Sequence, residues 1–337
     1  FQYIVAPGDI SADLDYTITT ALALNSGTIT DAAGNVADLT LQTPGSTGSL
    51  GASKALVIDG IAPIVYTVSS SSTDGIYNIG DTLAIAITFS DTVTVTGTPQ
   101  LTLETGSSDA LAAYHIGSGT TTLNFRYIVA NGHIASDLDY DSTASLALNG
   151  GTINDRSGNA ATLTLPVPGS SGSLGAEKAL VIDGIAPIVS AVSSSATDGT
   201  YSIGDTLDIS VTFSEEVSVS GTPQLTLETG TTDAVVDYTS GSGTSTLTFK
   251  FTIARGNTSS DLDYTDTTAL ALNGGSIMDA AGNSANVILP LPDSTGSLGY
   301  TKALVVDGGA PLVSSVSSTA VDSSYIIGDT LAITMVF

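Results

Sequence analysis

The sequence contains acidic and amide residues whose types and spacing suit the binding of a hard cation. Asp59, Asp183 and Asp307 each precede a Gly-x-Ala-Pro step, in "VIDGIAP" twice and in "VVDGGAP" once. A second motif, "DAAGN" or "DRSGN", begins at Asp31, Asp155 and Asp279. Calcium takes six to eight oxygen ligands from carboxylates and carbonyls at about 2.3–2.6 Å. These residues are therefore candidate calcium ligands if the fold gathers them.

A third acidic motif, "DLDY", begins at Asp13, Asp137 and Asp261. Its two carboxylates are two residues apart, so on a strand both would point to one side. This arrangement predicts a second, weaker cation site, made by Asp137 and Asp139 in one copy and by Asp261 and Asp263 in the next. The alternative is that these are solvated loop acids. The twelve-residue EF-hand pattern is absent.

The sequence gives no support to an enzyme. It has two histidines, His115 and His133, and one repeat later their places are taken by Thr239 and Asn257. Neither histidine has a partner His or Cys at ligand or triad spacing, so neither a zinc site nor a catalytic triad is predicted. A carboxylate pair that recurs in every copy is better explained as structural than as catalytic.

All these motifs recur at intervals of 124 residues without insertion or deletion. This period is far longer than that of a solenoid repeat, so each copy should be a domain with its own core. The repeat predicts complete copies at 60–183 and 184–307. Residues 1–59 would be the last part of another copy, and 308–337 the first part of a further one. Either the chain is cut from a longer array, or neighbouring chains complete its ends.

Within a copy the hydrophobic period is two, which is typical of β-strands with one buried face. In "TLDISVTF", Leu207 to Phe213 alternate apolar and polar residues, and "STLTFKFTI" places Lys250 on the polar side. Seven or more such strands separated by Gly-rich turns predict an all-β fold. We expect tandem immunoglobulin-like antiparallel β-sandwich domains in an elongated array.

An alternating trace of the strands brings the acidic motifs to the joint between two copies. The loop expected after Phe213, "SEEVSVSG", should lie at the end nearest the preceding linker. The candidate ligands at this joint are Asp183, Glu215, Glu216, Asp279 and Asn283. At the earlier joint they are Asp59, Asp91, Asp155 and Asn159, with Thr92 in place of the second Glu. The alternative is that "DAAGN" is only a turn, in which Asp accepts hydrogen bonds and Gly supplies a positive φ.

Composition restricts the classes of partner. The chain has 33 acidic and 7 basic residues and a formal net charge of −26. Phosphate backbones and anionic membranes repel such a chain, so we expect no nucleic-acid partner. There is no cysteine, and no run of eighteen apolar residues, so we expect neither disulfides nor membrane insertion in this segment.

Three stretches carry a resemblance to a known class of repeats: "FSEEVSVSGTPQLTLETG", "SSDLDYTDTTALALNGGSIMDAAGN" and "GSLGYTKALVVDG". The chain resembles, over its whole length, the tandem Ig-like repeats of giant bacterial extracellular surface proteins and adhesins (RTX/Bap-type stalk repeats). The resemblance implies a location at the cell surface and a stalk that is often calcium-dependent. We expect a structural spacer with calcium at its joints, whose partners are neighbouring repeats. The alternatives are a filament subunit completed by strands of identical chains, and a ligand-binding adhesion module.

Overall fold

The computed structural model describes residues 1–337, and its contacts divide the chain into two compact units. The first unit is Phe1–Gly184 and the second is Ile185–Phe337. Each unit contains one complete 124-residue copy with its own hydrophobic core. The finer division of the chain into four parts remains a prediction from the repeat.

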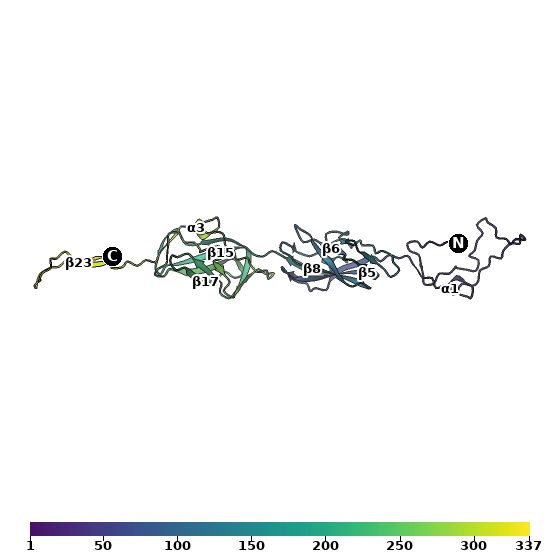
Figure 1. Ribbon diagram of the computed structural model, residues 1–337, viewed down its shortest axis with the longest axis horizontal. Coiled ribbons are helices and arrows are strands. Elements are labelled where there is room, and N and C mark those ends of the chain that lie inside the picture. Colours follow the sequence, from purple (N-terminus) through teal and green to yellow (C-terminus); the bar gives the residue numbers. More distant parts are fainter. The chain divides into compact units, whose positions relative to one another are not determined.

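The copy at 60–183 forms two sheets (Figure 1). The larger sheet has the strand order β10-β6-β7-β8-β5-β11, with β3 also paired to β5, and the smaller has the order β4-β12-β9. Among the strand pairs only that of β4 with β12 is parallel, and one isolated parallel bridge joins Ile64 to Thr162. The elements are β3 (Val65–Ser70), β4 (Gly75–Tyr77), β5 (Thr82–Thr96), β6 (Gln100–Leu103), β7 (Ala110–Ile116), β8 (Thr120–Ile128), β9 (Ile134–Ala135), β10 (Leu146–Ala147), β11 (Thr152–Asn154), α2 (Leu174–Glu177) and β12 (Leu180–Asp183).

The copy at 184–307 repeats this arrangement strand for strand. Its larger sheet has the order β13-β15-β18-β17-β16-β20, with β21 paired to β15, and its smaller sheet has the order β14-β22-β19. The elements are β13 (Val189–Ser194), β14 (Gly199–Ser202), β15 (Thr206–Ser220), β16 (Gln224–Leu227), β17 (Ala234–Ser240), β18 (Thr244–Thr252), β19 (Thr258–Ser259), β20 (Leu270–Ala271), β21 (Ser276–Met278), α3 (Leu298–Thr301) and β22 (Leu304–Asp307).

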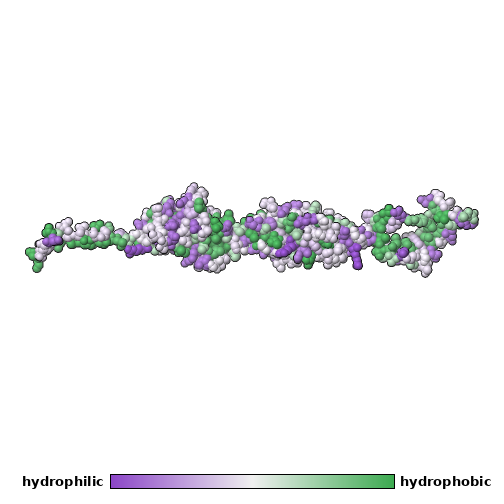
Figure 2. Space-filling view, in the orientation of Figure 1, coloured by the Kyte–Doolittle hydropathy of each residue, from purple (hydrophilic) through white to green (hydrophobic).

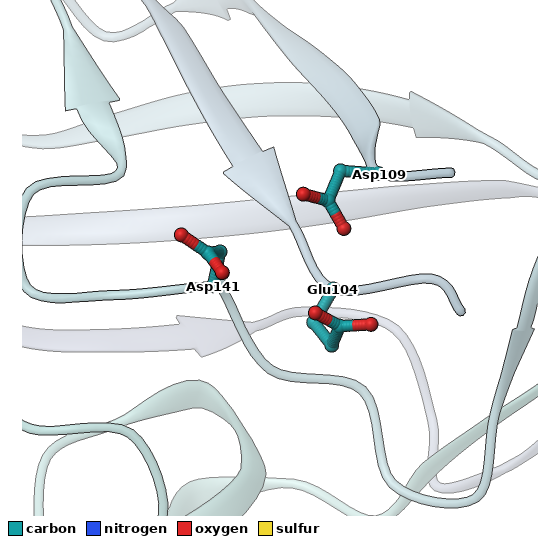
Figure 3. Close-up of side chains that lie close together, drawn as sticks. All are labelled: Glu104, Asp109 and Asp141. Atoms are coloured by element: carbon teal, nitrogen blue, oxygen red, sulfur yellow. The ribbon is translucent and has the colours of Figure 1, made fainter. Parts of the chain in front are cut away.

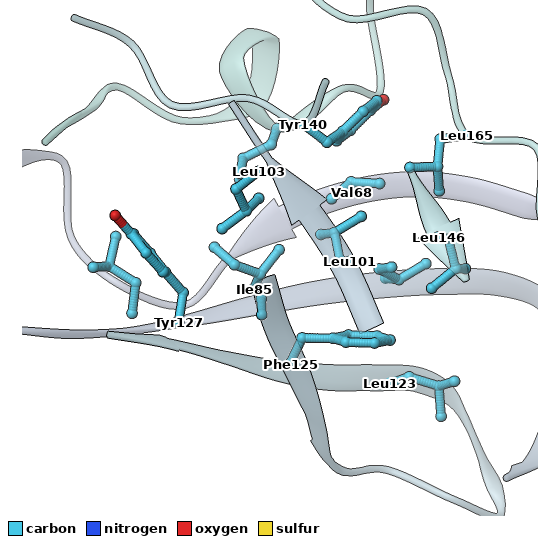
Figure 4. Packing of buried hydrophobic residues seen from close by; sticks show 14 of the residues in the cluster. Val68, Ile85, Leu101, Leu103, Leu123, Phe125, Tyr127, Tyr140, Leu146 and Leu165 are labelled. Carbon is cyan, nitrogen blue, oxygen red and sulfur yellow. The ribbon is translucent and has the colours of Figure 1, made fainter. Parts of the chain in front are cut away.

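The core of each copy lies between its sheets. Figure 4 shows Ile85, Leu101 and Phe125 of the larger sheet in one packed cluster, and Leu180 and Ile182 of the smaller sheet belong to the same cluster. The predicted alternation is confirmed in the second copy: Leu207, Ile209, Val211 and Phe213 are buried, as are Leu247, Phe249, Phe251 and Ile253, and Lys250 is exposed. The prediction of an all-β fold of antiparallel sandwich domains is confirmed.

One detail of the strand trace is wrong. The stretch "SEEVSVSG" is not the predicted loop after Phe213, because β15 continues as one strand to Ser220. Its register with β18 shifts between Thr212 and Val217; the pairing with β18 resumes at Val217, and β21 pairs with Ser218 to Ser220. Glu215 and Glu216 lie in this irregular stretch. A bulge therefore passes the strand from one partner to another where a loop was expected.

The remaining segments pair locally and have no core of their own. Residues 1–59 contain β1 (Ile10–Ser11), α1 (Leu50–Ser53) and β2 (Ile58–Asp59), and residues 308–337 contain β23 (Ser315–Ser318) and β24 (Ile333–Val336). Large apolar side chains such as Ile4, Val36, Ile326 and Phe337 are exposed there, and green surface is visible over these segments in Figure 2. No helix has the length and apolar character needed to cross a membrane.

Candidate functional site

The "DRSGN" and "DAAGN" motifs form closed turns. The backbone N–H of Asn159 donates to Asp155 Oδ1 at 2.8 Å, and its side-chain Nδ2 donates to Asp155 Oδ2 at 2.8 Å. Asn283 makes the same two bonds to Asp279, each 2.8 Å long. Both aspartates are buried. The pairing of Asp with the Asn four residues later therefore explains the motif as a turn, because it satisfies both oxygens of a buried carboxylate.

At the earlier joint, hydrogen bonds hold the linker acid against this turn. Ser157 Oγ donates to Asp59 Oδ2 at 2.7 Å, and Asn159 Nδ2 donates to the Asp59 carbonyl at 3.0 Å. The predicted approach of Asp59 to the "DRSGN" turn is thus present. Asp91 is exposed and accepts from the Thr92 N–H. Asp59, Asp91 and Asp155 do not form a group whose carboxylate oxygens all lie within 4.8 Å of one another.

In the second unit two predicted ligands do come together. The carboxylate oxygens of Glu215 and Asp279 lie within 4.8 Å of each other. Glu215 is half-buried, Asp279 is buried and Glu216 is exposed. Asn283 points its Nδ2 toward the Ile185 carbonyl and toward Asp279. The bulge in β15 therefore aims Glu215 at the turn and leaves Glu216 in solvent.

Asp183 belongs to the first unit, where it ends β12. It is half-buried and pairs with Ile134 of β9. The repeat gives Asp183 the sequence position of Asp59. Its role as a ligand remains a prediction.

The "DLDY" motif braces a distant loop in each copy. Asp139 accepts from the Tyr140 N–H and from the Gly169 N–H, both at 2.9 Å. The Tyr140 hydroxyl donates to the Pro166 carbonyl at 2.6 Å. Burial and the neighbouring Asp139 carboxylate raise the pKa of Tyr140 above its ordinary range. The second aspartate of "DLDY" is thus a structural acceptor, and we call this arrangement the tyrosine brace.

The brace recurs in the next copy with more negative charge around it. The Asp263 carboxylate accepts from the backbone N–H groups of Tyr264 and Asp293. The Tyr264 hydroxyl donates to the Pro290 carbonyl. Asp293 has φ 60°, in the left-handed region, where the earlier copies have Gly169 and Gly45. Burial, followed by the carboxylates of Asp293, Asp263 and Asp198, raises the pKa of Asp261. The first-copy equivalent, Asp137, is exposed like Asp261 but has no such fourth acid, because its copy has Gly169 at that place.

The structure also gathers three acids that the sequence did not single out. Glu104, Asp109 and Asp141 have carboxylate oxygens within 4.8 Å of one another, and all three are exposed (Figure 3). They come from the end of β6, the loop before β7 and the segment after Tyr140. No local spacing connects them, and the third is replaced by Thr265 one repeat later. Only the fold reveals this group.

The imidazole of His133 takes part in a turn. His133 Nδ1 accepts from the Ala130 N–H at 3.2 Å and lies 3.1 Å from the Tyr127 hydroxyl. Asn257 makes the equivalent bond in the next copy, where its Oδ1 accepts from the Ala254 N–H at 2.8 Å. His115 is exposed on β7. His133 is therefore a turn acceptor that an amide can replace.

Comparison with known proteins adds little to this picture. No family model matches the chain, and no curated protein matches it. Among solved structures it is similar to the I-band fragment I67-I69 from titin, with 11% sequence identity and a TM-score of 0.28. That match covers 72% of this chain, and the chain spans 65% of the fragment's length. The description of the fold therefore depends on the sheets and cores themselves.

Proposed function

We propose that this chain is a structural spacer, a stalk segment made of repeated β-sandwich modules. The observation that carries the proposal is what the two copies share. Their strand order, their Asp–Asn turns and their tyrosine braces agree position by position. The features that differ include two that a binding or catalytic site could use, His133 and the third acid, Asp141, of the group with Glu104 and Asp109. Selection for a repeated mechanical unit explains this division between constant and variable features.

We place the spacer outside the cell, in a bacterial surface fibre or adhesin. Support comes from the resemblance of its motifs to stalk repeats and from its large negative charge, which favours solubility. The proposed partners are adjacent repeats of the same chain. In this proposal the module is not an enzyme.

The test of the spacer function is a change in length. Deleting residues 184–307 joins Asp183 to Gly308 in phase with the repeat. Small-angle X-ray scattering should then show a maximum dimension shorter by the length of one folded module, while the remaining copy keeps its melting temperature. An unchanged dimension, or loss of folding of the remaining copy, would contradict independent spacer modules.

Calcium at the joints is part of the proposal. The donors brought together in the second unit, Glu215 and Asp279, are carboxylates, which is the ligand type that calcium prefers. A bound cation would offset the repulsion between two acids held within 4.8 Å. The other candidates near the joints contribute less to this proposal: Glu216 and Asp91 are exposed, and Asp155 has no carboxylate group gathered around it like that at Asp279.

Melting of the full chain with calcium or with chelator tests this part. Extracellular calcium sites bind at about 10⁻⁴–10⁻³ M, so 10 mM calcium should stabilise the second copy by roughly 1.4–2.7 kcal/mol. Glu215→Gln should remove most of that gain. Glu216→Gln is the matched control and should keep it, because this side chain is exposed next to Glu215. An equal response of both variants would reject the site.

A further inference from the structure

The residue that leaves each copy is held by a short turn of that same copy. In the first unit, Gly132 N–H donates to the Gly184 carbonyl at 2.8 Å, and Gly184 N–H donates to the His133 carbonyl at 2.7 Å. These two bonds continue the ladder in which Asp183 of β12 pairs with Ile134 of β9. The exit strand is thus paired one residue beyond the candidate ligand Asp183.

The same pair of bonds occurs at every equivalent position. Gly8 N–H donates to the Gly60 carbonyl at 2.8 Å, and Gly60 N–H donates to the Asp9 carbonyl at 2.8 Å. In the second unit, Gly256 donates to Gly308 at 3.1 Å, and Gly308 donates to Asn257 at 2.8 Å. Three copies with different neighbouring side chains keep one backbone arrangement.

Close approach explains why the exit residue is glycine. A Cβ on Gly184 would lie 2.4 Å from the Ala130 carbonyl oxygen and 2.7 Å from the His133 carbonyl oxygen. On Gly60 and Gly308 it would lie 2.5 Å from the equivalent oxygens of Ala6 and Ala254. None of these three glycines has a positive φ. The requirement is therefore for space against the turn and does not come from backbone conformation.

The turns that hold the exit glycines span residues 6–9, 130–133 and 254–257. In each turn the side chain of the last residue accepts a hydrogen bond from the first, and the chemical type of this side chain varies. The acceptor for the first amide of the turn is a carboxylate in Asp9, an imidazole in His133 and an amide in Asn257. Tyr3 also donates to Asp9, and this bond together with the Ala6 N–H lowers the pKa of Asp9. Tyr127 lies against His133 in the same way, whereas the next copy has Phe251. The common property is one hydrogen-bond acceptor.

We propose that this turn is an exit clamp, in which the side-chain acceptor at positions 9, 133 and 257 fixes the turn whose backbone holds the linker glycine, so that Gly60, Gly184 and Gly308 stay bound to the copy that they leave. The clamp deepens and rests on the proposed spacer function, because it sets how much of each joint can bend. It assigns a positioning role to His133 and Asn257, which neither the repeat motifs nor the cation hypothesis includes.

Hydrogen exchange of the full chain tests the clamp, because one molecule contains three copies of it. The Gly184 and Gly132 amides should be protected by their backbone acceptors. His133→Ala should speed their exchange about fivefold or more, since the turn that supplies these bonds loses the side-chain acceptor for its Ala130 N–H. The Gly60 and Gly308 amides are internal controls and should not change. The double variant Tyr127→Phe with His133→Asn reproduces the pair in the next copy, Phe251 and Asn257, and should restore protection.

A second variant changes the glycine itself. Gly184→Ala should speed exchange at the Gly132 amide, which donates to this residue, without affecting Gly8 or Gly256. Unchanged exchange at Gly184 in His133→Ala would overturn the clamp. So would equal acceleration of the β5 and β8 amides of that copy, because the effect would then be general destabilisation. If scattering rejects the spacer function while exchange behaves as expected, the clamp stands and only its purpose is lost.

Discussion

At the scale of single residues, the recurring polar side chains act mainly as acceptors and donors that hold loops. The second aspartate of "DLDY" accepts two backbone N–H bonds, and the tyrosine after it reaches a carbonyl 26 residues away. Motifs that would suit a cation site by spacing alone are thus largely satisfied by hydrogen bonds. Glu215 and Asp279 are two of the acids predicted as ligands at the joint, and the second unit brings their carboxylates together.

The tyrosine brace should contribute measurably to stability. Tyr264→Phe removes the donor to the Pro290 carbonyl, which is 2.6 Å away, and leaves that acceptor without the bond. We expect a loss of about 1–2 kcal/mol in the free energy of unfolding of the second copy. Tyr16→Phe is the matched control, because Tyr16 makes the equivalent bond to Gln42 in a segment without a core. Denaturant unfolding followed per copy would measure both, and equal effects would contradict a brace that depends on burial.

The acidic surroundings of Asp261 should make stability depend on pH. Its pKa is raised in the fold, so the ionised carboxylate costs stability at neutral pH. That cost disappears as pH falls through the raised value toward the ordinary value of 3.8. Asp261→Asn should therefore raise the melting temperature of the second copy at pH 7 and give no gain below about pH 3.8. Asp137→Asn is the control and should gain less, since Gly169 replaces Asp293 there.

At the scale of elements, the bulged strand β15 decides what the second unit can gather. It pairs with β18 as far as Val217 and with β21 from Ser218, and Glu215 lies where its register with β18 shifts. The tight connection before β21 depends on two adjacent glycines with different tasks. Gly274 has φ 77° and open space around it, whereas a Cβ on Gly275 would lie 2.1 Å from the Ser220 carbonyl oxygen.

These two glycines should respond differently to alanine. Gly274→Ala should cost about 1–2 kcal/mol, because an L-residue resists the left-handed conformation. Gly275→Ala should cost more, because the contact is with backbone and the β15–β21 pairing must open. Thermal melting of the second copy would rank the two variants. A smaller effect at Gly275 would show that this strand pairing yields easily and is not tightly packed.

At the scale of the whole molecule, the periodicity of the sequence predicted the architecture of the copies but not the tertiary contacts between their side chains. The 124-residue repeat and the alternation around Leu207 and Phe249 predicted all-β copies with separate cores, because both signals can be read along the sequence without knowing which segments pair. The continuation of β15 was missed, since polar residues such as Glu215 also suit a loop. Glu104, Asp109 and Asp141 could not be predicted as a group, because only tertiary pairing brings three distant segments together.

The central claim is that the chain carries equal, independently stable mechanical modules. Stretching single molecules of the full chain between its ends tests it most directly. The account predicts two unfolding steps, each releasing the length of one 124-residue copy, which is roughly 400 Å of extended chain. The segments 1–59 and 308–337, which lack cores, should extend without a step of their own. A single cooperative step, or two steps of clearly unequal length, would contradict the account.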